Sequence, residues 1–185
     1  FGCEPEAVPE LAALAGRLGV RIAGLSFHVG SQARTPEMHV HAIQECTRLL
    51  HQLRATLQIE PAVLDIGGGF PVDYGSGPAL PIEDFCAPIR AALAAVPAGT
   101  RVIAEPGRYI VAAAGTCLAT VMGRALRGGR WWYYLDDGLY GSYSGQLYDH
   151  ARYPLDSLKQ DWPRRPSVLA GPTCDSIDVV AEDLL

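Results

Sequence analysis

Three consecutive glycines stand directly after a short apolar run, and this junction constrains the fold more than any other stretch of the chain. The run Leu64-Asp65-Ile66 has the composition of a buried strand, and Gly67, Gly68 and Gly69 follow it without a spacer. Glycine adopts backbone conformations and approach distances that a β-carbon forbids. The junction is therefore either a tight strand-to-helix turn or a loop whose bare N–H groups can approach an anion.

A similar junction recurs about forty residues away on each side of the glycines. Upstream, the apolar stretch 22–27 ends in His28-Val29-Gly30-Ser31, and downstream, residues 102–104 end in Glu105-Pro106-Gly107-Arg108. Apolar residues at helical spacing fill the intervals, over 43–57 and 82–96. Strands that alternate with helices are typical of parallel sheets. The three junctions would then meet at the carboxyl edge of one sheet, where a βα barrel gathers its functional groups.

The pattern changes near residue 114. The β-rich runs 116–122, 131–135 and 167–170 are separated by turn residues, and no good helix stands among them. The sequence therefore predicts an α/β unit over residues 1–113 and part of a mainly antiparallel β domain over residues 114–185. Because only three or four strand–helix units precede the change, the first unit is expected to be the C-terminal half of a (β/α)8 barrel.

Composition excludes several classes of protein. A net charge of −5 argues against a nucleic-acid surface, and no run approaches the roughly 18 apolar residues of a membrane span. The five cysteines are widely spaced and include no C-x-x-C pair, so they indicate neither a disulfide framework nor a zinc site and favour a reducing cytosol. His39, His41 and His51 are interpreted as a solvated helix face, and no metal site is expected.

Six motifs follow one another along nearly the whole chain. They are Ser26-Phe-His-Val-Gly-Ser31, Leu64-Asp-Ile-Gly-Gly-Gly-Phe-Pro71, Ala104-Glu-Pro-Gly-Arg-Tyr109, Asp137-Gly-Leu-Tyr-Gly-Ser142, Leu147-Tyr-Asp-His150 and Gly171-Pro-Thr-Cys-Asp175. The ordered set resembles the pyridoxal-phosphate-dependent ornithine decarboxylases of the alanine-racemase-like fold. Any one motif is weak evidence, whereas six in order are highly specific.

The resemblance implies that the cofactor is pyridoxal 5'-phosphate. Glu105 would face the pyridine nitrogen and keep it protonated, and His28 would stack on the ring. The residues expected to bind the cofactor phosphate or its surroundings are Ser31, Gly67, Gly68, Gly69, Gly107 and Arg108. Without the resemblance, Glu105 reads as a turn-capping residue and His28 as a hydrogen-bonded core residue. No Walker-type lysine follows the glycines, which disfavours a nucleotide P-loop.

The resemblance also assigns residues to the substrate. Tyr140, Asp149 and Asp175 would receive the distal ammonium of a diamino acid, so that its chain length is measured as the position of a charge. Cys174 would deliver a proton to the substrate α-carbon after decarboxylation, although a cysteine in another context is more often buried filler. In the family the cysteine loop completes the neighbouring subunit's site, which implies a homodimer with shared active sites.

The expected reaction is therefore decarboxylation of L-ornithine to putrescine in polyamine biosynthesis, with L-lysine as a second candidate substrate. The alternatives are a diaminopimelate or arginine decarboxylase of the same fold, or a catalytically silent homologue that acts as a binding or regulatory protein. The family attaches its cofactor to a lysine in the first barrel strand, but the only lysine here is Lys159, in a polar connection. We therefore expect an interior fragment of a cytoplasmic enzyme, inactive alone, with no nucleic-acid or membrane partner.

Overall fold

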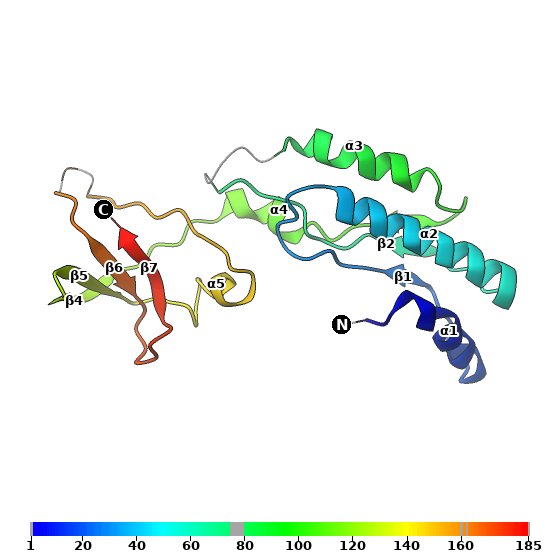
Figure 1. Ribbon diagram of the computed structural model, residues 1–185, viewed down its shortest axis with the longest axis horizontal. Helices are drawn as coiled ribbons and strands as arrows, with labels where there is room; N and C mark the ends of the chain where they lie inside the picture. The colour runs from blue at the N-terminus through cyan, green and yellow to red at the C-terminus, as the bar shows by residue number, and fades with distance from the viewer. Residues whose placement is uncertain (1, 75–79, 160, 162, 185) are drawn as a thin grey trace. The chain divides into compact units, whose positions relative to one another are not determined.

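The structure is a computed structural model, and it describes residues 2–74, 80–159, 161 and 163–184. The chain divides into two compact units, Phe1–Ala113 and Ala114–Leu185. Figure 1 traces both units from the N-terminus to the C-terminus.

The first unit contains a parallel sheet of three short strands. These are β1 (Gly24–Ser26), β2 (Val63–Asp65) and β3 (Arg101–Ile103), in the order β1-β2-β3. This confirms the parallel α/β arrangement. Strand-like hydrogen bonds continue beyond the strand ends, since the Ile66 N–H donates to the Ile103 carbonyl at 2.9 Å and the Glu105 N–H to the Gly67 carbonyl at 2.8 Å. The loops that follow the strands are therefore held side by side.

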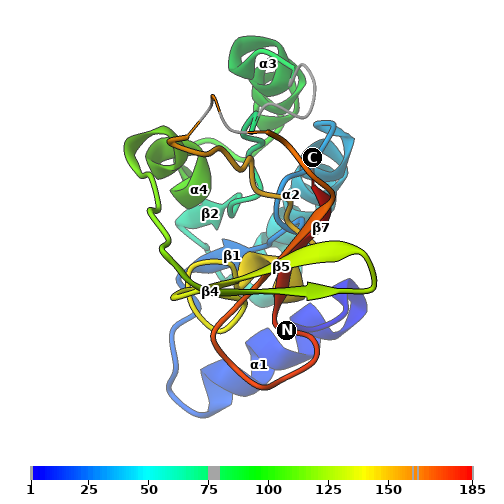
Figure 2. The ribbon, with the colours of Figure 1, turned by 90° about the vertical axis from the view of Figure 1, so that its left-hand side faces the viewer.

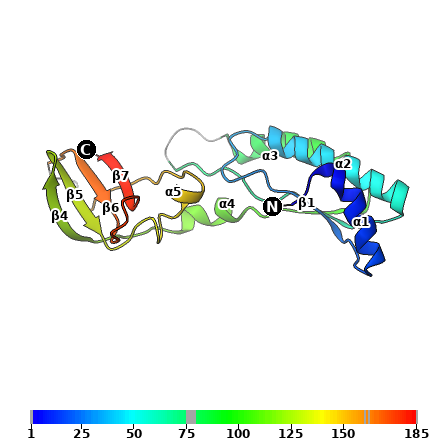
Figure 3. The same ribbon diagram turned by 60° about the horizontal axis from the view of Figure 1, so that its bottom comes forward.

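The helices of the first unit are the 3-10 turn η1 (Pro5–Ala7), α1 (Val8–Arg17), α2 (Glu37–Leu57), α3 (Ile82–Leu93) and the short α4 (Gly107–Val111), and the 3-10 turn η2 (Ala112–Ala114) lies at the boundary of the two units. Helices α2 and α3 run next to each other along the sheet (Figure 3). Their apolar faces form one core with β2, through residues such as Ile43, Leu50, Leu64, Phe85 and Ile89. No helix in the described residues is both long and apolar enough to cross a membrane.

One expectation about α2 is wrong. His39 is not part of a solvated face: its side chain is fully buried, whereas those of His41 and His51 are exposed. The reason is its position four residues before Ile43, which places His39 on the same apolar face of the helix. Its ring lies among Phe70 and Phe85.

The second unit contains a mixed four-stranded sheet, which can be followed in Figure 2. Its strands are β4 (Val121–Arg127), β5 (Arg130–Leu135), β6 (Ser167–Ala170) and β7 (Val179–Leu184), in the order β4-β5-β6-β7. The β4–β5 and β6–β7 pairs are antiparallel, but β5 and β6 are parallel. Residues 136–166 make the long connection that a parallel pair requires, and they include the short helix α5 (Gly145–Tyr148).

Two strand predictions in this unit need correction. Strand β4 begins at Val121 and not near residue 116, because it pairs with β5 through a two-residue hairpin in which Gly128 and Gly129 both have positive φ. The Arg124 guanidinium carbon lies 5.1 Å from the centre of the Trp131 ring across this hairpin, which favours the pairing. Strand β7 was not predicted, because its charged residues lower its intrinsic strand preference.

Candidate functional site

A hollow of about 200 Å³ opens at the carboxyl edge of the parallel sheet. All three strand-end loops contribute to it. Of the residues predicted for the cofactor, His28, Ser31, Gly68, Gly69, Glu105, Gly107 and Arg108 line the hollow, and so do Gln32, Phe70, Pro106 and Tyr109. The fold thus brings together residues that lie as much as 81 positions apart, from His28 to Tyr109.

The glycine loop is too closely packed for any other residue type. Gly67 has a φ of +65°, and a β-carbon there would lie 2.1 Å from the Phe27 carbonyl oxygen. Gly69 has a φ of +90°, and its β-carbon would lie 2.3 Å from the Gly30 oxygen. These distances are far below van der Waals contact, so both positions require glycine. The loop is pressed against the segment that follows β1.

The N–H groups of the three glycines differ in their hydrogen bonding. The Gly67 N–H donates to Asp65 Oδ1 at 2.9 Å, and the Gly68 N–H donates to His28 Nδ1 at 3.3 Å. The Gly69 N–H has no hydrogen-bond partner within the described parts of the chain. The expectation that the whole triplet offers bare N–H groups is therefore wrong for two glycines, because neighbouring side chains already close the loop. Gly67 also does not line the hollow.

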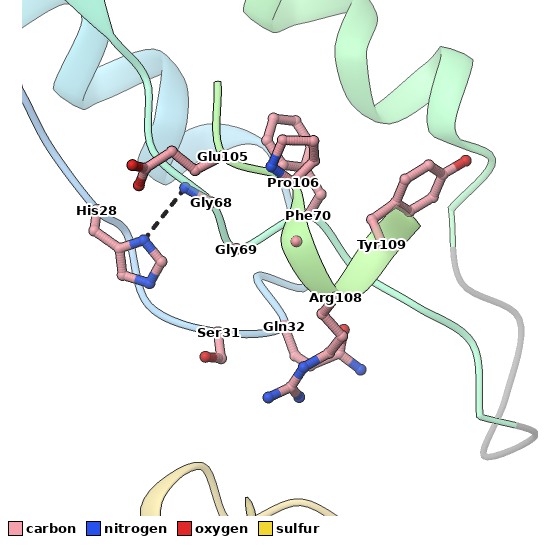
Figure 4. Close-up of a pocket in the computed structure, with 11 residues that line it drawn as sticks. His28, Ser31, Gln32, Gly68, Gly69, Phe70, Glu105, Pro106, Arg108 and Tyr109 are labelled. Carbon is pink, nitrogen blue, oxygen red and sulfur yellow. Dashed lines mark hydrogen bonds between the residues drawn. The ribbon is translucent and has the colours of Figure 1, made fainter. Parts of the chain in front are cut away.

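The polar side chains stand around the glycine loop at different points (Figure 4). Glu105 and the ring of His28 lie on one side, near the Gly68 nitrogen. Arg108 lies beside Gln32, with Ser31 between them and His28. The hollow therefore has a carboxylate and an imidazole at one end, and a hydroxyl and a guanidinium at the other. Such a distribution suits a ligand with a cationic ring at one end and an anionic group at the other.

Gln32 belongs to the site but was missed in the sequence. Its Nε2 donates to the Val72 carbonyl at 2.9 Å, and its Oε1 accepts the Val72 N–H at 2.7 Å. The side-chain amide thus imitates a backbone partner and joins the loop after β1 to the end of the glycine loop. The backbone of Gln32 is unusual in having a positive φ of 55°, but the sequence alone does not indicate this conformation.

The residues predicted for the substrate lie in the second unit. The Tyr140 hydroxyl donates to Asp175 Oδ2 at 2.6 Å, so the structure joins two of them directly. This hydrogen bond lowers the pKa of Asp175, and it raises the pKa of Tyr140. Cys174 precedes Asp175 and is exposed, whereas Asp149 lies on another segment, at the end of α5. The Tyr140 hydroxyl therefore fixes the orientation of the Asp175 carboxylate.

Asp178 organises these loops and was not predicted. It is buried, and its Oδ1 accepts the Leu139 N–H at 2.8 Å. Its Oδ2 accepts the N–H and the hydroxyl of Thr173, at 3.0 and 2.7 Å. Burial raises the pKa of Asp178, but the hydrogen bonds from Thr173 and Leu139 outweigh it and hold the pKa below its usual value. One carboxylate therefore connects the loop that carries Tyr140 to the loop that carries Cys174 and Asp175.

No group of three or more His, Cys, Asp or Glu side chains in the described residues is arranged to hold a metal ion. The Gly69 N–H, the Ser31 hydroxyl and the Arg108 guanidinium instead match a phosphate, and Glu105 matches a protonated ring nitrogen. The residues present thus fit an aromatic phosphate with a basic ring nitrogen.

Comparison with known proteins relates this site to characterised families. The family model for the pyridoxal binding domain of pyridoxal-dependent decarboxylases matches residues 1–112. The lysine/ornithine decarboxylase of Selenomonas ruminantium is 35% identical over 185 residues, which make up 100% of this chain and 47% of that protein. The chain spans about half the length of the curated relatives it matches.

Two solved structures are also similar along the whole chain. The lysine/ornithine decarboxylase of Vibrio vulnificus, in complex with cadaverine, superposes with a TM-score of 0.90 at 52% identity, over 100% of this chain and 51% of that one. The arginine decarboxylase of Paramecium bursaria Chlorella virus, bound to agmatine, gives a TM-score of 0.78 at 28% identity, over 100% of this chain and 50% of that one.

Proposed function

The chain belongs to the pyridoxal-dependent decarboxylases, and from this membership we propose that the protein decarboxylates L-ornithine to putrescine and accepts L-lysine as a second substrate. The observation that carries the proposal is the convergence of His28, the glycine loop and Glu105 on one hollow. Relatives named lysine/ornithine decarboxylases support the choice of a diamino acid.

The proposed cofactor is pyridoxal 5'-phosphate, and specific residues would hold it. The Gly69 N–H, the Ser31 hydroxyl and the Arg108 guanidinium would bind its phosphate. When bound, the cofactor supplies a protonated pyridine ring that accepts the electron pair released as CO₂ leaves. Glu105 would hold the proton on the ring nitrogen, because a carboxylate stabilises the charged form of a neighbouring base. His28 would cover one face of the ring and exclude water.

The proposed substrate contacts come from the second unit. Asp175 would pair with the distal ammonium of the substrate, and the Tyr140 hydroxyl supports this role because it holds the carboxylate in one orientation. Asp149 is proposed as a second acidic contact. Cys174, which is exposed, would donate a proton to the substrate α-carbon. These roles require the Cys174 loop to reach a cofactor site, and we propose that it does so across a homodimer with shared active sites.

The fold supports a finer proposal about architecture. Three parallel strands in sequential order, with functional residues after each, are what a segment of a (β/α)8 barrel contains. We propose that the first unit is the C-terminal half of such a barrel. The second unit would then be part of the β domain of a cytoplasmic enzyme.

Replacement of Glu105 tests the reaction. In the full-length protein, Glu105→Ala should leave pyridoxal phosphate bound and lower kcat by about 100-fold to 1,000-fold, the usual cost of removing one electrostatic stabiliser of a transition state. CO₂ release and the absorbance of the bound cofactor are measured on the same samples. Glu60→Ala, which removes an exposed carboxylate of the same unit, should leave both unchanged.

Near-normal turnover in Glu105→Ala with the cofactor retained would contradict the proposed role. A wild-type protein that binds pyridoxal phosphate but releases no CO₂ from ornithine, lysine, arginine or diaminopimelate would favour a catalytically silent homologue. Turnover of arginine or diaminopimelate alone would favour the corresponding alternative enzyme.

A further inference from the structure

His39 is a buried polar residue directly beneath the glycine loop. Its imidazole is fully buried in helix α2 and packs among aromatic rings, with centroid distances of 6.3 Å to Phe27, 5.2 Å to Phe70 and 5.7 Å to Phe85. Its Nε2 lies 2.9 Å from the carbonyl oxygen of Gly68. A phenylalanine would fit this apolar cluster without the cost of burying two ring nitrogens.

The hydrogen bond to Gly68 defines the protonation of the ring. A carbonyl oxygen only accepts, so Nε2 must carry the hydrogen and donate it. Nδ1 has no hydrogen-bond partner within the described part of the chain. Burial lowers the pKa of His39 against the smaller, opposing effect of the Gly68 carbonyl. His39 is therefore neutral, and its single donor is directed at one loop carbonyl.

That carbonyl belongs to the peptide group that also contains the Gly69 N–H. A trans peptide is planar, so its C=O and its N–H point in opposite directions, and no cis peptide is present. With the Gly68 oxygen turned inward to His39, the Gly69 N–H must point outward. Gly68 and Gly69 both line the hollow, and the Gly69 N–H has no partner within the described residues.

A peptide between two glycines is the kind that rotates most easily, because no side chain resists the change in φ and ψ. The preceding peptide is already fixed, since the Gly68 N–H donates to His28 Nδ1. The following one is fixed by the hydrogen bond from the Ala33 N–H to the Gly69 oxygen, at 2.9 Å. His39 supplies the remaining restraint, on the peptide between them.

We propose that His39 is a positioning residue for phosphate binding: it locks the Gly68–Gly69 peptide so that the Gly69 N–H faces the hollow. The inference rests on the proposed binding of pyridoxal phosphate. It adds a residue that contacts neither phosphate nor substrate, and it explains why a histidine occupies an aromatic core.

The test compares variants of His39 in the full-length, cofactor-free protein. His39→Phe fits the cluster but cannot donate, and His39→Asn is too short to reach the carbonyl, whereas His39→Gln carries its amide nitrogen near the position of Nε2. Equilibrium dialysis measures the affinity for pyridoxal phosphate and for pyridoxal, which lacks the phosphate. The ratio of the two affinities reports phosphate binding.

We expect His39→Phe and His39→Asn to reduce this ratio about tenfold or more, because both lose the buried hydrogen bond to the Gly68 carbonyl. His39→Gln keeps a donor there and should hold the ratio within about threefold of wild type. Amide hydrogen exchange in the proteolytic fragment that contains Gly67–Gly69 should become faster in His39→Phe and His39→Asn but not in His39→Gln. If His39→Phe does not fold, the comparison of His39→Asn with His39→Gln still tests the proposal.

Two controls separate positioning from packing. Phe85→Leu disturbs the same cluster without touching Gly68 and should lower the melting temperature but not the ratio. His51→Phe changes an exposed residue of the same helix and should change neither. A ratio that falls in Phe85→Leu as much as in His39→Phe would overturn the proposal, as would an unchanged ratio in His39→Phe. A wild-type protein with no preference for the phosphorylated ligand would instead contradict the proposed function.

Discussion

Asp175 offers the most direct test of substrate recognition at the level of single residues. Asp175→Ala should raise the KM for ornithine at least about tenfold with little effect on cofactor affinity, because a bound ammonium loses its charged partner. Tyr140→Phe should have a smaller effect in the same direction, since it removes the hydrogen bond that orients the Asp175 carboxylate. Steady-state kinetics measure the KM of each variant. Asp183→Ala, which removes an exposed carboxylate of the same unit, is the control. An unchanged KM in Asp175→Ala would show that the distal amine binds elsewhere.

Asp178 should matter for stability and not for substrate contact. Asp178→Asn places an amide NH₂ against N–H donors from two loops and should reduce the free energy of unfolding by about 1–3 kcal/mol at pH 7. Urea denaturation measures the change. Asp183→Asn removes only an exposed ion pair with Arg130 and should change stability little.

The same residue predicts a pH dependence. Because the folded pKa of Asp178 lies below its ordinary value of 3.8, its contribution to stability is fully present above that pH. The contribution is lost as the pH falls through the folded pKa. The difference in unfolding free energy between wild type and Asp178→Asn should therefore be constant from pH 5 to 7 and shrink below about pH 4. A difference that grows on acidification would contradict this assignment.

At the level of elements, the glycine loop should tolerate no β-carbon. Gly69→Ala must move the Gly30 carbonyl, because the new carbon would lie 2.3 Å from it. Gly99→Ala is a matched control: its φ of +85° is similar to the +90° of Gly69, but no atom lies within 4 Å of its β-carbon. Gly99→Ala should therefore cost only the left-handed backbone strain of about 1–2 kcal/mol, and Gly69→Ala should cost clearly more. Equal losses in urea denaturation would show that the loop is looser than described.

The sequence predicted the elements whose patterns are local. The helical spacing of Ile43, Leu50 and Leu53 located α2, and the apolar runs before the glycines and before Glu105 located β2 and β3. The short helix α4 and strand β7 were missed, because neither has a distinct periodicity. The parallel pairing of β5 and β6 depends on a distant connection that no local pattern encodes.

The site could be predicted in part for the same reason. His28, Ser31, Glu105 and Arg108 follow strands, so their motifs indicated a common edge. His39 and Asp178 could not be identified, because each acts on a backbone group that is distant in sequence: Gly68 is 29 positions from His39, and Leu139 is 39 positions from Asp178. A hydrogen bond to a backbone carbonyl or N–H leaves no mark in the sequence, because nearly every residue type carries both groups.

At the level of the whole molecule, the location of the single lysine leads to a prediction. Lys159 is exposed and belongs to the second unit, outside the three strand-end loops of the first. Pyridoxal enzymes use a lysine amine to engage the cofactor. The 185-residue chain by itself, mixed with pyridoxal phosphate, should therefore release no CO₂ from ornithine. The test is borohydride trapping with peptide mapping, combined with a CO₂ assay. Stoichiometric labelling of Lys159 in a sample that releases CO₂ would contradict the prediction.

The parallel contact between β5 and β6 also leads to an expectation about the order in which the second unit folds. The β4–β5 hairpin is a local pairing closed by two glycines, so we expect it to form before β5 meets β6, a contact between strands that are distant in sequence. Closing a longer loop costs more chain entropy, and contacts between distant residues slow folding. The segments that carry Tyr140 and Cys174 flank this contact, so we expect both to take up their final arrangement late in folding.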